Sequence, residues 1–441
     1  MNTPICDFVR NYVQSDPLRL HVPGHKGCGP YGIEALDITE VDGTQQLIAQ
    51  SRENAGAVFG CPTFYSAEGS SLCIRAMLHL CVLYANAHGR RAIIAAGRNA
   101  HSAFVSAAAL LDLDVHWLHP RESESYLSCK MDAPSLDKAL CSMRDKPVAV
   151  YLTSPDYLGN TLDIASLAQV CHRHGCLLLI DNAHGAYLKF LEPSRHPIDE
   201  GADLCCDSAH KTLPVLTGGA YLHISPNAPA LFVQRAADAL SLFGSTSPSW
   251  LILQSLDAVN PYLSGDYRKK LCDFTAQLEA LKSELTAHGY VLTGDEKLKL
   301  TIRTKPYGYE GNAFADLLRR AKIECEFSDP DFVVFMFTPE MGILGLQQLK
   351  AALLAIPARQ PLDRPPPAYH ENMQVCSLRK AAFSDSEILP LSQCIGKVFA
   401  DLHTHCPPAV PVVICAERID EAAAEHLAYY GTTQCRVMKN F

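Results

Sequence analysis

One lysine and one aspartate carry the chemistry that this sequence suggests. Lys211 lies just after a serine and a histidine, in the run from Asp207 to Leu213. Asp181 ends the apolar run 177–180 and lies about 30 residues earlier, close to the length of one βα unit plus a further strand. A lysine that forms a Schiff base and a carboxylate that keeps a pyridine nitrogen protonated are what a pyridoxal-phosphate site needs. The pair therefore predicts a pyridoxal-phosphate (PLP) site.

A glycine-serine turn could hold the phosphate of such a cofactor. Residues 69–71 read Gly-Ser-Ser and open an apolar helix predicted over 72–84. The start of a helix offers free backbone N–H groups and the positive end of the helix dipole, and the serines add two hydroxyls. Serine is also an ordinary helix N-cap, so this turn alone is a weak signal.

Strand and helix patterns alternate over about 200 residues and must position these side chains. Alternation of this kind predicts a mainly parallel sheet with helices on both faces. Ligands bind such sheets at the carboxyl ends of the strands. We therefore expect the loops after successive strands to meet at one edge; these loops are 97–101, 153–157, 181–184 and 208–211.

The pattern changes after about residue 265. A long helix is predicted over 265–288, followed by an alternating, antiparallel strand over 297–303. Mixed elements of this kind predict a smaller α+β domain. The remaining expected elements are a helix at 312–320, a strand at 331–337, helices at 343–355 and 384–390, a strand at 410–415 and a helix near 419–429.

Composition narrows the class of protein. The chain has 441 residues, of which 48% are apolar, so it can bury a large core. The net charge of −9 argues against a nucleic-acid or anionic-membrane partner. No apolar run reaches the roughly 18 residues that span a membrane, and the N-terminus does not resemble a signal peptide.

The cysteines and histidines are expected to be structural. The 18 cysteines include many in apolar runs, such as Cys73, Cys81 and Cys205, which indicates reduced, buried side chains in a cytoplasmic protein. The clusters at 171–176 and 403–406 lack the matched ligand spacing of zinc sites. We therefore expect no bound metal.

Nine short motifs occur in a fixed order along the chain. They are 23–27 (PGHKG), 37–40 (DITE), 69–71 (GSS), 98–101 (RNAH), 154–159 (SPDYLG), 181–186 (DNAHGA), 208–211 (SAHK), 247–249 (SPS) and 407–408 (PP). In this combination the chain resembles the Orn/Lys/Arg decarboxylase family, in a short form without the N-terminal wing domain of larger members. The likeness covers nearly the whole chain.

The resemblance implies an α/β fold of PLP fold type I, similar to aspartate aminotransferase, with a mainly parallel sheet in the large domain. It divides the chain into an N-terminal segment (1–50) that contributes to the active site or dimer, a PLP-binding domain (51–265) and a small α+β domain (266–441). It also implies a homodimer or higher homo-oligomer.

The family assigns roles to the residues around the cofactor. Lys211 would hold PLP and Asp181 would pair with its ring nitrogen, while His101 and Ala183 would cover the two faces of the ring. His184 lies beside the Schiff base by motif, where it could contact the substrate carboxylate or move a proton. The phosphate would bind at Gly69, Ser70, Ser71, Ser208 and His210, with Thr246 reaching the phosphate of the partner subunit.

Several positions depart from the family pattern. They are Thr44–Leu47, Glu68, Asn182, Tyr187, Thr217–Gly218, Ala409 and Cys415–Glu417. The cofactor core is retained, so the reaction is better supported than the identity of the amino acid. A cationic substrate side chain calls for a carboxylate at the pocket mouth, and Asp37, Glu40 and Glu417 are the candidates.

The implied reaction is decarboxylation of lysine, arginine or ornithine to the corresponding amine, a precursor in polyamine biosynthesis, and carbon dioxide. Two alternatives stay open. The same scaffold could carry out other PLP chemistry, such as transamination or lyase chemistry; Arg379 could then bind the substrate carboxylate. The chain could also be a degenerate homologue that binds PLP without turnover.

Overall fold

The structure, a computed structural model, describes residues 1–39, 41, 43–120, 125–402 and 411–439. The chain forms two compact units, one of residues 1–84 with 179–272 and one of residues 85–178 with 273–441. Each unit is assembled from separate stretches of sequence. The division into 1–50, 51–265 and 266–441 stays a prediction.

The first unit is built around buried strands. Strands β1 (Thr63–Ser66), β7 (Ala220–Ile224), β6 (Leu204–Asp207) and β5 (Leu177–Asp181) are neighbours in that order. Strands β5 and β6 are parallel, whereas β7 is antiparallel to both β6 and β1. Every residue of β5, β6 and β7 is buried, which is why these segments read as continuous apolar runs. Besides the N-terminal helix, the helices of this unit are α2 (Thr44–Phe59), α3 (Gly69–Ala87), α7 (Ala209–Thr212), α8 (Ala230–Ser241) and α9 (Trp250–Ser264), with a 3-10 turn η1 at Ala186–Phe190.

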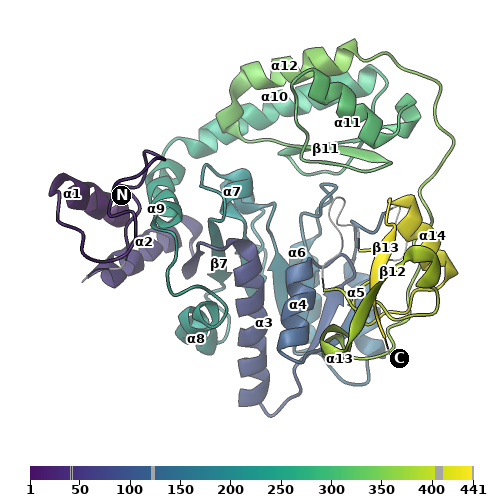
Figure 1. Ribbon diagram of the computed structural model, residues 1–441, viewed down its shortest axis with the longest axis horizontal. Helices are drawn as coiled ribbons and strands as arrows, with labels where there is room; N and C mark the ends of the chain where they lie inside the picture. The colour runs from purple at the N-terminus through teal and green to yellow at the C-terminus, as the bar shows by residue number, and fades with distance from the viewer. Residues whose placement is uncertain (40, 42, 121–124, 403–410, 440–441) are drawn as a thin grey trace. The chain divides into compact units, whose positions relative to one another are not determined.

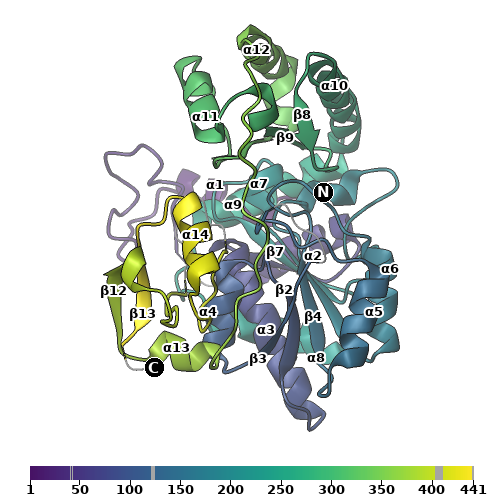
Figure 2. The same ribbon diagram turned by 90° about the vertical axis from the view of Figure 1, so that its right-hand side faces the viewer.

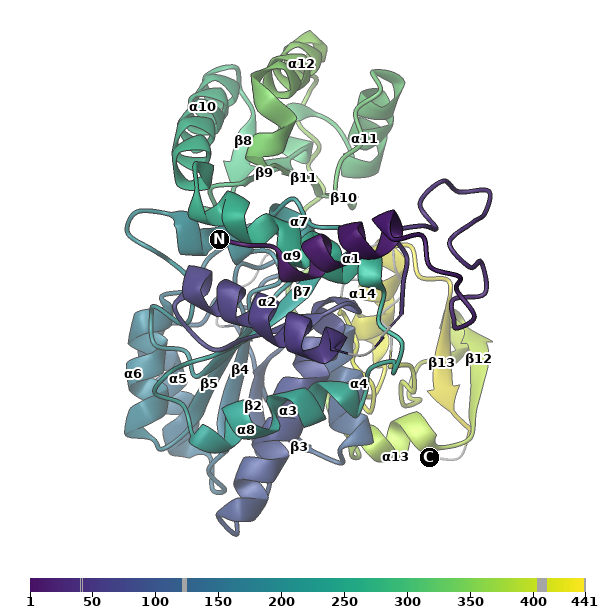
Figure 3. The same ribbon diagram turned by 90° about the vertical axis from the view of Figure 1, so that its left-hand side faces the viewer.

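The N-terminal helix α1 (Pro4–Gln14) is tied to α9 by a buried carboxylate. Asp257 Oδ2 accepts hydrogen bonds from the backbone N–H groups of Ile5 and Cys6, each at 3.0 Å. Its other oxygen accepts from Ser51 Oγ at 2.6 Å, on α2. Figure 3 shows α1, α2 and α9 packed together. Asp257 thus satisfies the free N–H groups at the start of α1 and joins three helices.

The second unit contains three sets of strands. Strands β4 (Ala149–Thr153), β2 (Ile93–Gly97) and β3 (Asp114–Leu118) are parallel in the order β4-β2-β3. The helices between them are α4 (Ser102–Leu110), α5 (Ala133–Ser142) and α6 (Ile164–Arg173). The expected alternation of strand and helix, and the mainly parallel sheet, are therefore confirmed.

The later part of this unit is α+β, as expected. Strands β10 (Phe327–Ser328), β11 (Phe332–Met336), β9 (Lys299–Arg303) and β8 (Val291–Thr293) form an antiparallel sheet. Figure 2 shows α10 (Tyr267–Ala287), α11 (Gly311–Arg320) and α12 (Gly342–Ala355) beside it. A two-stranded sheet of β12 (Ser386–Pro390) and β13 (Gln434–Met438) follows, close to α14 (Glu421–Tyr429) (Figure 1).

Two expected elements near the C-terminus are wrong. The helix predicted at 384–390 is strand β12, and the helix lies just before it as α13 (Leu378–Phe383). The strand predicted at 410–415 is irregular over 411–415, and residue 410 lies outside the described residues. In the first case pairing with β13, about 50 residues away, decides the conformation, and local apolar spacing does not reveal such a partner.

The cysteines match their expected state. None of the 17 cysteines among the described residues is in a disulfide, and Cys73, Cys81 and Cys205 are buried. Helix α3 is long and apolar enough to cross a membrane by length and composition, which the sequence reading did not anticipate. Of its apolar 18-residue window, 56% is buried inside the protein, so this is weak evidence for a membrane span.

A buried acid in the second unit predicts a pH-dependent stability. Burial raises the pKa of Asp329 from 3.8 to about 7, although the side chain accepts hydrogen bonds from the N–H groups of Asp331 and Phe332. The folded state thus retains a proton that the unfolded state has lost, and stability falls as pH rises from about 4 to about 7. Replacing Asp329 with asparagine should remove this loss.

Relative to the wild type, the free energy of unfolding of Asp329→Asn is expected to increase by up to about 1.4 kcal/mol for each pH unit between about 4 and 7. Above pH 7 the difference between the two proteins should stay constant. Urea unfolding at pH 4.5, 6 and 7.5 measures it. A free-energy difference between the two proteins that stays the same at all three values would contradict the burial of an ionisable Asp329.

Candidate active site

Lys211 contacts His184 at the carboxyl end of two neighbouring strands. Strand β6 ends at Asp207, Ser208 follows, and Lys211 lies on the short helix α7. Its Nζ is 2.9 Å from Nε2 of His184, which lies just after the end of β5. One of these two nitrogens must supply the hydrogen and the other must accept it. The pair can therefore pass a proton between a primary amine and an imidazole.

Asp181 is the last residue of β5, and only 2% of it is exposed. Its Oδ1 accepts a hydrogen bond from the backbone N–H of Ala183 at 3.2 Å, and the thiol of Cys206 is 3.6 Å away. Removing a carboxylate from water is costly unless a cation or several donors compensate. A protonated ring nitrogen is a partner of that kind. Both Asp181 and Ala183 thus have the burial that their predicted roles require.

Two serines that are far apart in sequence meet at the start of α3. Ser208 Oγ donates to Ser70 Oγ at 2.7 Å, and the N–H of Gly69 donates to the carbonyl of Gly218 at 2.7 Å. Gly69 has a positive φ of 72°, and a side chain there would meet no other atom within 4 Å. The two hydroxyls, with Ser71 in the first turn of the 19-residue helix α3, provide the donors that a phosphate needs.

The loop before α9 lies against the same turn. The backbone N–H of Ser245 donates to Glu68 Oε1 at 2.6 Å, and the following residue, Thr246, is exposed. The departure at Glu68 thus has a structural role, because its carboxylate joins the serine turn to this loop. The predicted reach of Thr246 to the phosphate of a partner subunit stays a prediction.

His210 and His101 have separate surroundings. His210 Nδ1 is 3.0 Å from the carbonyl of Gly219, which holds the ring against the loop before β7. His101 lies in the second unit, is exposed, and caps α4 by accepting from the N–H of Ala103 at 3.1 Å. Its predicted stacking on the cofactor ring stays a prediction. The structure thus places the other named site residues in one unit and His101 in the other.

The residues of the first unit suit PLP. They combine a lysine amine, a buried carboxylate, paired hydroxyls and the start of a long helix. The loops after β5 and β6 and the turn before α3 bring them together. These are the donors that the aldehyde, the ring nitrogen and the phosphate of this cofactor require.

The candidate substrate acids differ in their surroundings. Oδ2 of Asp37 lies 3.2 Å from Nε2 of His25, in the partly exposed PGHKG loop. Glu417 is 1% exposed on its side chain and pairs with Arg98 at 2.7 Å, and burial raises its pKa. That carboxylate is therefore engaged within the second unit. Glu40 lies outside the described residues.

The arginine offered for transamination is also engaged. Nη1 of Arg379 donates to the carbonyl of Leu110 at 3.0 Å and thus satisfies the C-terminal end of α4. Its guanidinium also lies over the ring of Phe383, 5.1 Å from the ring centroid. These contacts give Arg379 a structural role, so the alternative that relied on it loses its distinguishing residue.

Sequence reasoning missed a buried polar cluster behind Lys211. Asp207, the last residue of β6, contacts Asn182, His196 and His223, and all four side chains are fully buried. The signal in the sequence was an aspartate and two histidines within or beside apolar runs, which permits but does not identify such a contact.

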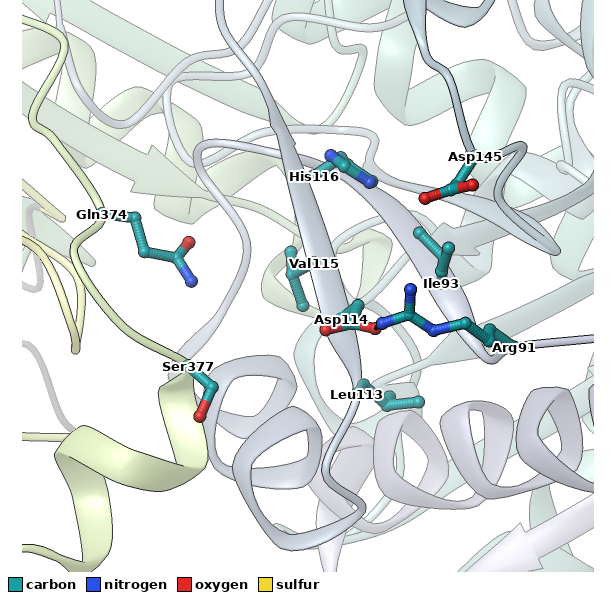
Figure 4. Close-up of a pocket in the computed structure, with 9 residues that line it drawn as sticks. All are labelled: Arg91, Ile93, Leu113, Asp114, Val115, His116, Asp145, Gln374 and Ser377. Atoms are coloured by element: carbon teal, nitrogen blue, oxygen red, sulfur yellow. Dashed lines mark hydrogen bonds and ion pairs between the residues drawn. The ribbon is translucent and has the colours of Figure 1, made fainter.

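A surface pocket of about 200 Å³ lies elsewhere, along strand β3 (Figure 4). Arg91 extends toward Asp114 on one side of it, and Gln374 and Ser377 lie on the other. None of the predicted site residues lines it. Because the Arg91–Asp114 pair is exposed, it contributes little binding energy, and we assign this pocket no role in the chemistry.

Comparisons with known proteins agree with the motifs. The sequence model of the family described as Orn/Lys/Arg decarboxylase, major domain, matches residues 3–293. An uncharacterized protein of Bacillus subtilis, YaaO, is 26% identical over 100% of this chain and 96% of its own length. The arginine decarboxylase of Bacillus subtilis is also 26% identical, over 97% of this chain and 92% of its own.

Solved structures show the same fold. The constitutive lysine decarboxylase of E. coli has a TM-score of 0.77 at 15% identity, and the match covers 99% of this chain and 82% of the E. coli chain. Lysine decarboxylase A from Pseudomonas aeruginosa has a TM-score of 0.80 at 16% identity, covering 97% and 75%. These likenesses confirm the α/β fold of PLP fold type I.

Proposed function

Because the chain belongs to the Orn/Lys/Arg decarboxylase family, a family of PLP-dependent enzymes, we propose that it converts a basic amino acid to the corresponding amine and carbon dioxide. The substrate is lysine, arginine or ornithine. The observation that carries the proposal is the contact between Lys211 and His184, 2.9 Å apart, together with the buried carboxylate of Asp181.

Each residue has a proposed task. Lys211 would hold the cofactor through Nζ until the amino group of the substrate takes its place and frees the lysine, and Asp181 would hold the proton on the ring nitrogen. When bound, PLP supplies an electron sink for the charge left on the α-carbon after carbon dioxide departs. Lys211 then returns a proton to that carbon, and His184 holds or replenishes this proton.

The phosphate is proposed to bind at Ser70, Ser71 and Ser208. Ser208→Ala should raise the dissociation constant for PLP by about tenfold, since it removes a hydrogen bond to a charged group and leaves Ser70 without its donor. Titration of the cofactor-free protein, followed by fluorescence, measures the change. Ser142→Ala, on the exposed face of α5, is the matched control, and equal affinities for the two variants would contradict the assignment.

We also propose that the enzyme is a cytoplasmic homodimer or higher homo-oligomer whose amine product enters polyamine biosynthesis. The exposed position of Thr246 beside the Glu68 turn supports a role across an interface. Sedimentation of the PLP-loaded protein at several concentrations tests the oligomeric state. A monomer at all concentrations would overturn it.

The reaction is tested by loading the purified protein with PLP and supplying L-lysine, L-arginine and L-ornithine separately. Carbon dioxide and the amine are measured together, which distinguishes decarboxylation from transamination, since the latter gives a keto acid and no carbon dioxide. Equal amounts of both products from one substrate are expected. A protein that binds PLP but releases neither product from any of the three would overturn the proposal.

A further inference from the structure

The fully buried cluster behind Lys211 is centred on the carboxylate of Asp207. Its Oδ2 lies 3.2 Å from Nε2 of His196 and 3.2 Å from Nε2 of His223, while its Oδ1 accepts from Asn182 Nδ2 at 2.7 Å. Burial alone would raise the pKa of Asp207, but the two histidines hold it well below the ordinary value. The carboxylate is therefore the acceptor on which three separate segments converge.

Asp207 and Asn182 each lie next to a residue of the candidate active site. Asp207 precedes Ser208, and Asn182 follows Asp181. The backbone also joins the two strand ends, because the N–H of Asn182 donates to the carbonyl of Cys206 at 3.0 Å. The Asn182 side chain thus connects the end of β5 to the end of β6. The segments that follow these two strands carry the catalytic candidates His184 and Lys211.

The Asn182 side chain also fills the turn that carries His184. A Cβ placed on Gly185 would lie 2.0 Å from Asn182 Oδ1, so the amide packs directly against that glycine. The N–H of Gly185 donates to the Asn182 carbonyl at 2.8 Å, closing the turn. If the side chain at 182 lost its hydrogen bond to Asp207, the turn would therefore change conformation, and the position of the His184 ring would change with it.

We propose that Asp207 and Asn182 form a positioning pair that fixes the His184 turn and the Lys211 helix relative to each other. This role deepens the proposed function, on which it rests. The pair touches neither substrate nor cofactor. It acts by maintaining the 2.9 Å contact between Lys211 and His184. Asp207 is itself held in place by His196 and His223.

A buried metal site is the competing interpretation of the same residues. The ligand atoms of His196, Asp207 and His223 lie within 4.8 Å of one another, a spacing that a metal ion could bridge. Asp207 is, however, already supplied with donors, and the second ring nitrogen of His196 is buried and has no hydrogen-bond partner among the residues that the structure describes. A metal-bound histidine usually donates that nitrogen to an acceptor. The contacts thus favour a hydrogen-bonded network.

The test exchanges the amide and the carboxylate. Asn182→Asp places two buried carboxylates face to face and should lower kcat by about 100-fold, since like charges at this distance cannot both be ionised. Adding Asp207→Asn restores one donor and one acceptor between the two positions, with the donor now at 207 and the acceptor at 182, and should recover kcat to within about tenfold of the wild type. Asp331→Asn is the control for a general loss of stability, because Asp331 is a buried carboxylate that pairs with Lys305 and both residues lie in the second unit.

A second readout does not depend on turnover. In cofactor-free protein, hydrogen exchange of the backbone amides at 182–185 and 208–213 should quicken in Asn182→Asp and slow again in the exchanged double variant. Asp331→Asn should leave both segments unchanged. These exchange results hold even if no basic amino acid is decarboxylated, so failure of the proposed function and failure of the positioning pair are distinguishable.

Three results would overturn the positioning pair. One is unchanged kcat and unchanged exchange in Asn182→Asp, and another is a double variant that performs no better than Asn182→Asp alone. The third is stoichiometric metal in the purified wild type, found by mass spectrometry and lost in His223→Ala, which would make the cluster a metal site.

Discussion

Replacing Lys211 with alanine is expected to lower carbon dioxide release by at least about 1,000-fold, because the variant loses both the covalent hold on the cofactor and the proton donor. The Lys211→Ala variant should still fold, because Lys211 is only half-buried on the short helix α7. The loss should appear in kcat rather than in the free energy of unfolding. His184, its contact at 2.9 Å, should remain in place on its own turn.

Two further variants make this result specific. Lys211→Arg keeps a positive charge but cannot act as an amine nucleophile near neutral pH, so it should be as inactive as the alanine variant. Lys138→Ala, at an exposed position on α5, should keep wild-type activity. Carbon dioxide release by Lys211→Ala above about a tenth of the wild-type rate would show that another group does this chemistry.

The core of the candidate site could be predicted from the sequence because its signals are local. Asp181 and Lys211 each follow an apolar strand, and in a parallel pair such as β5 and β6 the ends of the strands lie side by side. The Gly-Ser-Ser turn begins a helix that the apolar spacing also predicts. In each case the backbone element and the chemical group lie within a few residues of each other.

The remaining contacts depend on pairings that sequence spacing does not encode. The register of β6 against β7 sets Cys205 opposite His223, and this brings the histidine to Asp207. Arg98 reaches Glu417 across 319 residues, and one of the three candidate carboxylates for the pocket mouth is therefore buried in an ion pair. Long-range register and packing decide both, and neither leaves a periodic signal in the chain.

Asp181→Asn is expected to lower kcat by about 100-fold or more, because it removes a charge but preserves shape. The asparagine oxygen can still accept from the N–H of Ala183, which the wild-type Oδ1 contacts at 3.2 Å. What is lost is the negative charge of a side chain that is only 2% exposed, where electrostatic interactions are strong. A neutral amide cannot hold the proton on the ring nitrogen as a carboxylate does, so the electron sink weakens.

Comparison with Asp181→Ala separates this charge from the hydrogen bond to Ala183. If charge is the main contribution, the two variants should lose kcat to a similar extent, while PLP affinity, measured by fluorescence titration, falls further in the alanine variant. Steady-state release of carbon dioxide supplies kcat and KM for each. An asparagine variant within about tenfold of the wild-type kcat would show that the carboxylate serves the fold at the end of β5, and that the ring nitrogen finds its partner elsewhere.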